Sequence, residues 1–392
     1  MDYPENATEI FKVKKPARFT GFTGLYLASA FRGLGMNLIS LFIPLYILKI
    51  TGSVVTIFLF YAFYHFWVVA SVYPVAILVR RFGVDLICFL GCLMRAFFIF
   101  FLLKAESQPF FLWWAAVAWG ITVSFYWLPF HYSFTVAEKE DGKYGKEVSR
   151  LHIVYRITEL IGPVAGGFLI ASLGFKPLFS LVIVLMIISG LPLFFDTIQG
   201  KGMRLSFGKI VGHLVKKERF KFWLSLAGAE LETTILGLAW PLFIYFAVKN
   251  YEALGIIKSG AALVSMVLIW FLGQWVDKKG KSILRLGTII NSFNILLRSF
   301  ITSPFGLFLV DSAHKLTAEL VSTPFGSAFY EKAFQMRKLE FMVEREFVLH
   351  FSGMVACLLV GLLFVLNVSW FWIFCLGAGG LMAKNYILDS NV

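Results

Sequence analysis

Charged residues are scarce in this chain, and their scarcity excludes an ordinary soluble protein. Only 15% of the 392 residues are Asp, Glu, Lys or Arg, whereas 59% are hydrophobic, and the mean hydropathy is +0.78. A soluble domain has too little interior to bury so large an apolar fraction. Apolar runs long enough to cross a bilayer as helices, about 20 residues each, recur along the whole chain. The sequence therefore predicts an all-α integral membrane protein.

Features that secreted proteins and enzymes need are also missing. The four cysteines, Cys88, Cys92, Cys357 and Cys375, lie within apolar runs, so they predict buried thiols and no disulfide framework. The opening stretch MDYPENATEIFKVKK has no apolar core and does not resemble a cleavable signal peptide. We find no Walker loop, nucleophile motif or metal-ligand spacing in the sequence. We therefore expect no enzyme activity, no cofactor and no metal site.

Acidic residues are outnumbered, because 23 Asp and Glu face 36 Lys and Arg, for a net charge of +13. The basic residues gather on one side when successive breaks between apolar runs are assigned alternately to two sides. The rich side holds those of 12–18, 80–81, 139–146, 201–221, 278–285, 332–338 and Lys384, and the poor side holds Lys49, Lys104, Lys176, Lys249 and Lys258. The positive-inside rule makes the rich side cytoplasmic. We therefore expect anionic lipid headgroups as partners and no nucleic acid.

Twelve membrane-spanning helices are predicted from the apolar runs. They lie near 20–48, 53–79, 84–103, 109–137, 147–172, 177–196, 219–248, 254–276, 282–302, 304–331, 341–366 and 369–388. Both termini are then cytoplasmic. The basic break 197–218 separates two six-helix bundles, 1–196 and 219–392. This break is either a loop or an amphipathic helix on the inner membrane surface.

The two predicted bundles resemble copies of each other. Pro44 of IPLYI and Pro241 of WPLFI are 197 residues apart, and so are Gly83 and Gly280, which follow the second span of each bundle. Further matches are Pro129-Phe130 with Pro324-Phe325 at an offset of 195, and Leu151-His152 with Leu349-His350 at 198. Two parallel repeats of six spans with a substrate path between them are typical of a large class of secondary transporters.

The break after the predicted eighth span, GQWVDKKGKS at 273–282, resembles the loop signature of the major facilitator superfamily. The matching residues are Gly273, Asp277, Lys278, Gly280 and Lys281, while the last basic position holds Ser282. In the first bundle, Ala76 and Arg80 replace the glycine and the aspartate. The resemblance implies a cytoplasmic latch, with Asp277 at the N-terminus of the eleventh span. The alternative is a solvated loop, which accounts for the lysines but not for the spacing.

A second motif lies in the predicted fifth span. GPVAGG at 162–167 resembles the core of a motif associated with proton-driven exporters of the same superfamily. Pro163 is expected to bend the helix, and Gly162, Gly166 and Gly167 to let the other bundle approach closely. Thr158 stands where the family has a further glycine. The motif indicates either an exporter or a packing kink that has no bearing on the direction of transport.

Ionisable residues deep within a span are costly, so they indicate a polar pathway or internal ion pairs. Five basic and five acidic residues fall there, and their charges cancel. The candidates for a substrate or proton pathway are Arg32, His152, Arg156, Glu159, Glu230, Glu232, Asp311, His314, Lys315 and Glu319. We expect Arg95 to be structural and Arg298 to snorkel toward the membrane surface.

The spacing of these candidates predicts two charged stripes. One comprises His152, Arg156 and Glu159 on one face of the fifth span, and the other Asp311, Lys315 and Glu319 on the tenth, with His314 beside them. Because Lys315 can fully serve only one acidic neighbour on its helix, we expect the coupling proton first on Asp311 or Glu319. The alternative is a purely structural ladder of salt bridges.

The family resemblance also implies that the first, fourth, seventh and tenth spans line a central cavity. Arg32 and the tenth-span stripe would then border the cavity with one of Glu230 and Glu232. These two glutamates point about 200° apart on a helix, so we expect the other one to pair sideways. The glutamate that meets Arg32 across the cavity is the second choice for the proton.

Together these features predict a secondary active transporter. We expect a monomer in the plasma (cell inner) membrane that exports a small amphiphilic organic solute in exchange for protons, by alternating access. Two alternatives stay open. A flippase for lipids or lipid-linked glycans on the same fold would need lateral openings, and a receptor or scaffold that does not transport would tolerate neutral replacement of its buried charges.

Overall fold

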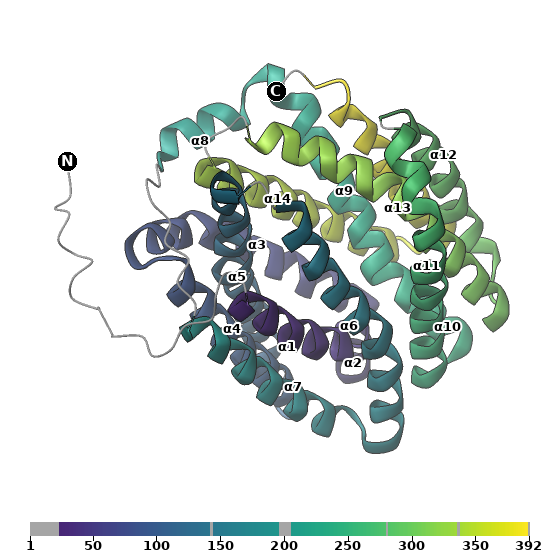
Figure 1. Cartoon of the computed structure of the whole chain (residues 1–392). Coiled ribbons are helices and arrows are strands. Elements are labelled where there is room, and N and C mark those ends of the chain that lie inside the picture. The colour runs from purple at the N-terminus through teal and green to yellow at the C-terminus, as the bar shows by residue number, and fades with distance from the viewer. Residues whose placement is uncertain (1–22, 142–143, 196–204, 280, 335–337, 391–392) are drawn as a thin grey trace.

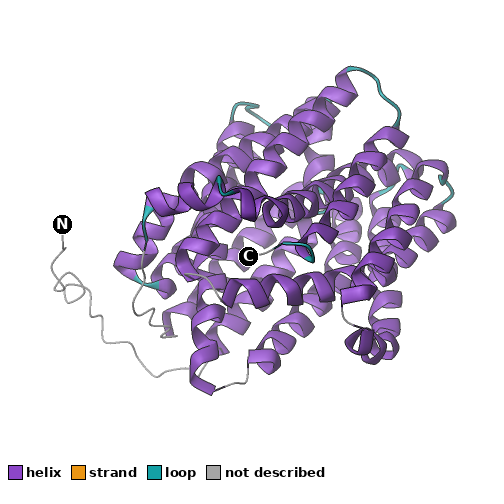
Figure 2. Cartoon of the chain, turned by 90° about the horizontal axis from the view of Figure 1, so that it is seen from above, coloured by secondary structure: helices purple, strands orange, loops and turns teal. Residues whose placement is uncertain are grey.

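Helices form the regular structure of every part of the chain that is described. The computed structural model describes residues 23–141, 144–195, 205–279, 281–334 and 338–390. Figure 2 shows helices joined by short loops in these ranges. The chain is therefore all-α, as the apolar runs predict.

The N-half, residues 1–196, begins with seven α-helices in close succession. They are α1 (Thr23–Ile39), α2 (Ile43–Thr51), α3 (Val54–Phe82), α4 (Val84–Lys104), α5 (Phe111–Asp141), α6 (Tyr144–Leu173) and α7 (Phe175–Gly190), followed by a 3-10 turn, η2 (Leu191–Phe195). Gly83 has a φ of +89° between α3 and α4, a conformation that favours glycine. Ser53 caps α3 by accepting a hydrogen bond from the Thr56 amide at 3.2 Å.

A short helix and the C-half, residues 219–392, follow. The elements are α8 (Phe207–Leu214), η3 (Lys217–Arg219), α9 (Phe220–Thr234), the π-helical turn η4 (Ile235–Ala239), α10 (Trp240–Val248), α11 (Tyr251–Lys279), α12 (Lys281–Leu297), η5 (Arg298–Phe300), α13 (Pro304–Phe334), α14 (Lys338–Val365), α15 (Trp370–Ala383) and η6 (Lys384–Ile387). The predicted break 197–218 thus contains a helix, α8, within its described part.

Eight stretches of the described chain are long and apolar enough to cross a membrane. They are Tyr26–Thr51, Val54–Phe82, Val84–Lys104, Phe111–Tyr132, Ile153–Leu173, Phe175–Leu193, Lys217–Val248 and Leu339–Val365. The other four predicted spans coincide with α11, α12, α13 and α15. Of these, α12 has 17 residues and α15 has 14, which is short for a full span. The count of twelve spans therefore stays a prediction.

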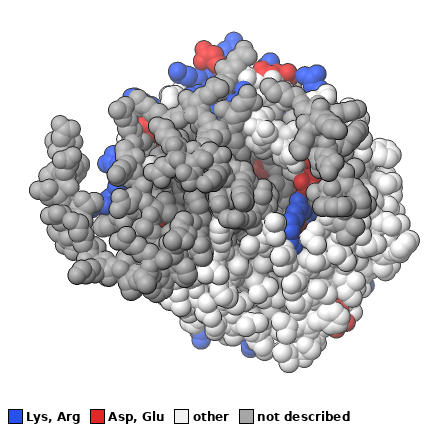
Figure 3. Space-filling model, in the orientation of Figure 1, with Lys and Arg blue, Asp and Glu red and all other residues white. Residues whose placement is uncertain are grey.

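Uncharged surface covers the lower right part of the molecule in Figure 3, and charged side chains lie along its upper and lower edges. A few acidic and basic side chains are instead recessed in a hollow of this face. This distribution suits a protein surrounded by lipid, whose charges lie either at the membrane surfaces or inside the bundle.

The first span of each half is interrupted at the same place. α1 ends at Ile39 and α2 begins at Ile43, and a shift of 197 residues carries this gap into the π-helical turn η4. Pro44 and Pro241 follow the two interruptions. Because proline has no N–H and its ring crowds the carbonyl four residues earlier, it disfavours regular α-helix in the turn before each position. The predicted spans near 20–48 and 219–248 are each present as one apolar stretch, Tyr26–Thr51 and Lys217–Val248. The turn within the first and the π-helical segment within the second were not predicted.

Helix contacts occur mostly within each half. α1 packs on α6 and α7, and α4 on α5 and α7; in the C-half, α9 packs on α14 and α15, and α13 on α11 and α12. The two large contacts between halves are α3 with α14 and α6 with α11. Figure 1 accordingly shows the purple and blue helices α1–α5 on one side and the green helices α11–α13 on the other.

The GPVAGG segment lies at the contact between α6 and α11. A side chain added at Gly167 would meet the Tyr251 carbonyl oxygen at 2.6 Å, and one added at Gly255 would collide with Pro163. The Val164 amide donates a hydrogen bond to the Ser259 hydroxyl at 3.0 Å. Only part of the motif serves this contact between halves, because Gly162 and Gly166 instead pack against α1 of the same half.

Candidate functional site

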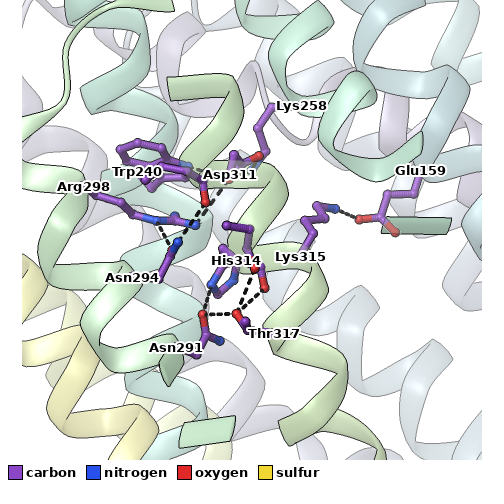
Figure 4. A network of polar contacts seen from close by, with 12 residues as sticks. Glu159, Trp240, Lys258, Asn291, Asn294, Arg298, Asp311, His314, Lys315 and Thr317 are labelled. Carbon is purple, nitrogen blue, oxygen red and sulfur yellow. Dashed lines mark hydrogen bonds and ion pairs between the residues drawn. The ribbon is translucent and has the colours of Figure 1, made fainter. Parts of the chain in front are cut away.

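The charged stripes of α6 and α13 interlock with each other. Lys315 forms an ion pair with Glu159, and Arg156 forms one with Glu319, while a guanidinium nitrogen of Arg156 also lies 3.6 Å from Glu159. We call Arg156, Glu159, Lys315 and Glu319 the ion-pair ladder. Figure 4 shows Lys315 reaching across to Glu159. Lys315 therefore pairs with the N-half, and the expectation that it serves Asp311 or Glu319 on its own helix was wrong.

Asp311 lies on the same helix as Lys315, α13, but in a separate buried network. The Trp240 indole N–H donates to its Oδ1 at 2.7 Å. Lys258 Nζ lies 3.1 Å from Oδ2, and a nitrogen of Arg298 lies 3.5 Å from Oδ1. The Arg298 guanidinium also covers the Trp240 ring at 4.3 Å. We call these four residues the Asp311 cluster (Figure 4).

The buried positions of two members of the Asp311 cluster, Lys258 and Arg298, were not predicted from the sequence. Lys258 was assigned to the poor side of the membrane, yet its ammonium group reaches Asp311 inside the bundle. Arg298 was expected to snorkel, yet it is fully buried. Both residues lie close to predicted span ends, where sequence alone cannot decide whether a long side chain turns outward or inward.

The ladder and the Asp311 cluster together carry a positive charge. Their cations are Arg156, Lys258, Arg298 and Lys315, and their carboxylates are Glu159, Asp311 and Glu319. Four cations thus face three anions. The ladder side chains are between 16% and 35% exposed, so water or a solute can reach them, whereas Asp311 and Arg298 are sealed inside.

Amide side chains of α12 hold this part of α13 in place. The Asn291 carbonyl oxygen accepts a hydrogen bond from the Thr317 hydroxyl at 3.0 Å and lies 2.7 Å from Nδ1 of His314. Asn294 donates to the Val310 carbonyl at 3.2 Å and lies 3.5 Å from Nε of Arg298. Figure 4 shows His314 turned toward α12 and away from Glu159.

Arg32 and the glutamates of α9 do not meet. The Arg32 guanidinium covers the rings of Tyr126 and Trp127 at 3.8 and 4.8 Å, and within the described residues no carboxylate lies in ion-pair range of it. Glu232 pairs with Lys384 of η6, whereas Glu230 lies 3.9 Å from His65. The two glutamates therefore face different neighbours, as a spacing of two residues on a helix requires.

Histidines from both halves form another buried group. Nδ1 of His65 on α3 lies 2.8 Å from Nδ1 of His350 on α14. The other ring nitrogens lie 3.9 Å from Glu230 and 3.4 Å from Glu346. We call Glu230, His65, His350 and Glu346 the histidine chain. Gly353 makes room for it, because a side chain there would collide with the His65 ring.

In the sequence, His350 served only as a marker of the repeat, and His65 was not among the candidate residues. A signal was available, since Glu346 and His350 are four residues apart, the spacing at which helix side chains meet. Nothing in the sequence linked them to His65, which is 285 residues from His350.

A fourth polar group ties α8 to the C-half. Glu344 on α14 lies 2.6 Å from Nδ1 of His213 and 2.8 Å from a guanidinium nitrogen of Arg219. The proposed latch cannot be compared with this group. Gly280 lies outside the described residues, as do the surroundings of Gly273 and the side chains of Asp277, Lys278, Lys281 and His152.

Comparison with known proteins agrees with the all-helical membrane fold. A family model described as Major Facilitator Superfamily matches residues 25–330. The chain is also 25% identical over 304 residues to "Uncharacterized protein YqgE" of Bacillus subtilis (strain 168), across 74% of this chain and 68% of that protein. Since the family match covers well over half of the sequence, the chain belongs to the major facilitator superfamily of membrane transporters.

Proposed function

We propose that this protein is a secondary active transporter that exports a small amphiphilic organic solute in exchange for protons, by alternating access. Membership of the superfamily supports small-molecule transport in general. In this proposal the N-half and the C-half are two bundles of six spans that rock against each other, with both termini in the cytoplasm. The confinement of most helix contacts to one half or the other supports such a division.

The ion-pair ladder is the observation that carries the proposal. Its two pairs join α6 of the N-half to α13 of the C-half, so rocking of the halves has to separate them. Charges that lose their partners in a membrane need water or a ligand in exchange. A solute with a polar group can supply that replacement in the open state, and the pairs can re-form when the solute leaves. The ladder thus links solute binding to the position of the halves.

Aromatic rings beside buried cations support an amphiphilic solute. Tyr126 and Trp127 of α5 lie against Arg32 of α1, on helices that the family resemblance places around the cavity. Rings of this kind pack against apolar groups and also attract cations. The GPVAGG motif supports export, and a proton gradient is the driving force that this direction implies.

The proposed orientation predicts which loops are accessible from which side. Cysteines introduced at positions 139 and 281 should react with a membrane-impermeant reagent only from the cytoplasm. Cysteines introduced at 104 and 249 should react only from the opposite side, because the positive-inside rule places the lysine-poor breaks there. The unsubstituted protein with its four cysteines gives the background. Labelling of all four positions from one side would contradict the topology.

Glu159→Gln is expected to slow transport severely. The change removes the negative charge that pairs with Lys315, and the closed ladder then contains an uncompensated ammonium group. We expect solute flux in proteoliposomes to fall about tenfold or more, since about 1.4 kcal/mol between conformations changes their ratio tenfold. Drugs, organic anions, sugars and fluorescent lipids are the solutes to screen, with and without a pH gradient.

Glu106→Gln is the matched control for Glu159→Gln. Glu106 lies in the loop before α5 with Lys49 and Lys176 at 3.4 and 3.3 Å. Slight burial raises the pKa of this carboxyl, but hydrogen bonds and charges of the two lysines outweigh that effect and hold the pKa below its ordinary value. Its replacement removes the same charge from a solvated pair. Equal flux in the two variants would refute the role of the ladder, and movement of lipid alone would favour a flippase.

A further inference from the structure

The histidine chain crosses the boundary between the halves. His65 lies on α3 and His350 on α14, and the contact of these two helices is one of the two large contacts between the halves. Both rings are buried, with 5% and 9% exposure, whereas the Glu230 side chain is 17% exposed. The chain therefore runs from a partly accessible carboxyl group into the closed interface.

The short contact between the rings fixes the number of hydrogens. Two ring nitrogens at 2.8 Å need one hydrogen between them. A neutral imidazole carries a single N–H. The ring that donates through Nδ1 therefore has no hydrogen left on Nε2, and this bare nitrogen faces a carboxylate oxygen, which repels its lone pair. The accepting ring keeps its hydrogen on Nε2 and can offer it to its own glutamate.

One extra proton removes this conflict. It can sit on Nε2 of the donating ring, which makes that ring an imidazolium attracted to the facing carboxylate, or on the facing carboxyl group, which removes the negative charge beside the bare nitrogen. In either form the chain holds three hydrogens. Two neutral imidazoles and two ionised carboxylates hold only two.

We propose that the histidine chain is the binding site of the coupling proton, which it holds while α3 and α14 are in contact and releases when they part. Separation removes the contact between the two Nδ1 atoms. Each ring can then turn its single hydrogen toward its own glutamate, and the third proton leaves to the water that enters between the helices. This inference rests on the proposed transport function, because it assigns the proton of that cycle to specific residues.

The surroundings of the chain favour Glu230 as the entry point of the proton. The charged and titratable side chains around it are Tyr64 on α3, Arg345 and Cys357 on α14, Arg95 on α4, His131 on α5 and Lys384 of η6. Of the cations, Arg345 pairs with Glu346 and Lys384 with Glu232. Within the described part of the chain, Glu230 has His65 as its sole ion-pair partner.

These contacts reverse the order of candidate proton sites that was expected from the sequence, in which α13 came first and α9 second. Asp311 already has Lys258 and Arg298 within 3.5 Å, and Glu319 already has Arg156. Their charges are matched without a proton. Glu230 lacks such a permanent cation, so α9 replaces α13 as the first choice.

Nuclear magnetic resonance of the purified protein tests the site without any solute. With ¹⁵N-labelled histidine, we expect one strongly deshielded proton that couples to Nδ1 of two rings. The signal should be lost in both His65→Gln and His350→Gln and be kept in His213→Gln, which removes a histidine outside the chain. As pH rises, loss of the single extra proton should change the signals of both rings at the same pH. Two rings that titrate independently, with no shared proton, would overturn the proposal even if the variants fail to fold.

Transport then tests whether this proton is the coupling proton. In proteoliposomes, His65→Gln and Glu230→Gln should reduce accumulation of solute driven by a pH gradient by roughly tenfold or more. Exchange of labelled for unlabelled solute should persist, because exchange requires no net proton movement. Variants that still accumulate solute would disprove the histidine chain as coupling site and leave the transport proposal standing. A wild-type protein that neither accumulates nor exchanges any solute of the panel would instead disprove the transport proposal.

Discussion

Asp311→Asn is expected to destabilise the fold by about 3–5 kcal/mol, the range found when one partner of a buried ion pair is removed. Arg298 is fully buried, and its guanidinium would lose the carboxylate that lies 3.5 Å away. Asparagine keeps an oxygen that can accept the Trp240 indole hydrogen bond, so the effect isolates the charge. Thermal or denaturant unfolding in detergent measures it.

Asp389→Asn provides the control, because it removes the same charge from an exposed pair. Arg285 and Asp389 lie 3.3 Å apart, with 62% and 47% of their side chains exposed, and such pairs contribute about 0–1 kcal/mol. Adding Arg298→Met to Asp311→Asn should recover part of the lost stability by removing the stranded charge. Equal destabilisation by the two aspartate variants would show that the Asp311 cluster contributes no more than a surface pair.

Lys315→Glu is expected to abolish transport by forcing the ladder open. The new carboxylate would face Glu159, and two like charges about 4 Å apart repel by about 4 kcal/mol at an effective dielectric constant of 20. Adding Glu159→Lys restores opposite charges and should recover part of the flux. Recovery is expected to be incomplete because Arg156 lies 3.6 Å from position 159. Solute flux in proteoliposomes at matched protein content is the measurement.

Lys176→Glu makes the same charge reversal at a lysine that is 71% exposed and 3.3 Å from Glu106. Water screens the repulsion there, so little loss of flux is expected. If Lys315→Glu transports as well as this control, or if Glu159→Lys worsens the double variant, the two residues do not act as a pair across the halves.

Helix positions follow from local signals and were largely predictable. The predicted helices 53–79 and 84–103 match α3 (Val54–Phe82) and α4 (Val84–Lys104), because Ser53 and Gly83 mark their ends by local chemistry. The interruptions before Pro44 and Pro241 carried the same kind of signal. The prolines were not used to predict an interruption, because they lie within long apolar runs. An apolar run does not distinguish one long helix from two short ones.

Charged partners were harder to predict than charged faces. The spacing of Arg156 and Glu159 placed them on one face of α6, but their partners lie on α13, more than 150 residues away. Partner choice depends on how each helix is rotated and how close the halves approach, which periodicity does not determine. The same reason explains why His65 and His350 were not connected.

Because the first span of each half is interrupted, two short helices, α2 and α10, lie at one end of the molecule. α2 and α10 have nine residues each, about 14 Å of helix, and each is joined to its longer partner at a weak point. Between them, Tyr251 packs against Phe42 and Phe175 of the N-half and Tyr245 of α10. Tilting α2 or α10 about its interruption would loosen these aromatic contacts of Tyr251 without separating the pairs of the ion-pair ladder. We therefore expect the end of the molecule that holds Tyr251 to open and close without the proposed rocking of the two halves.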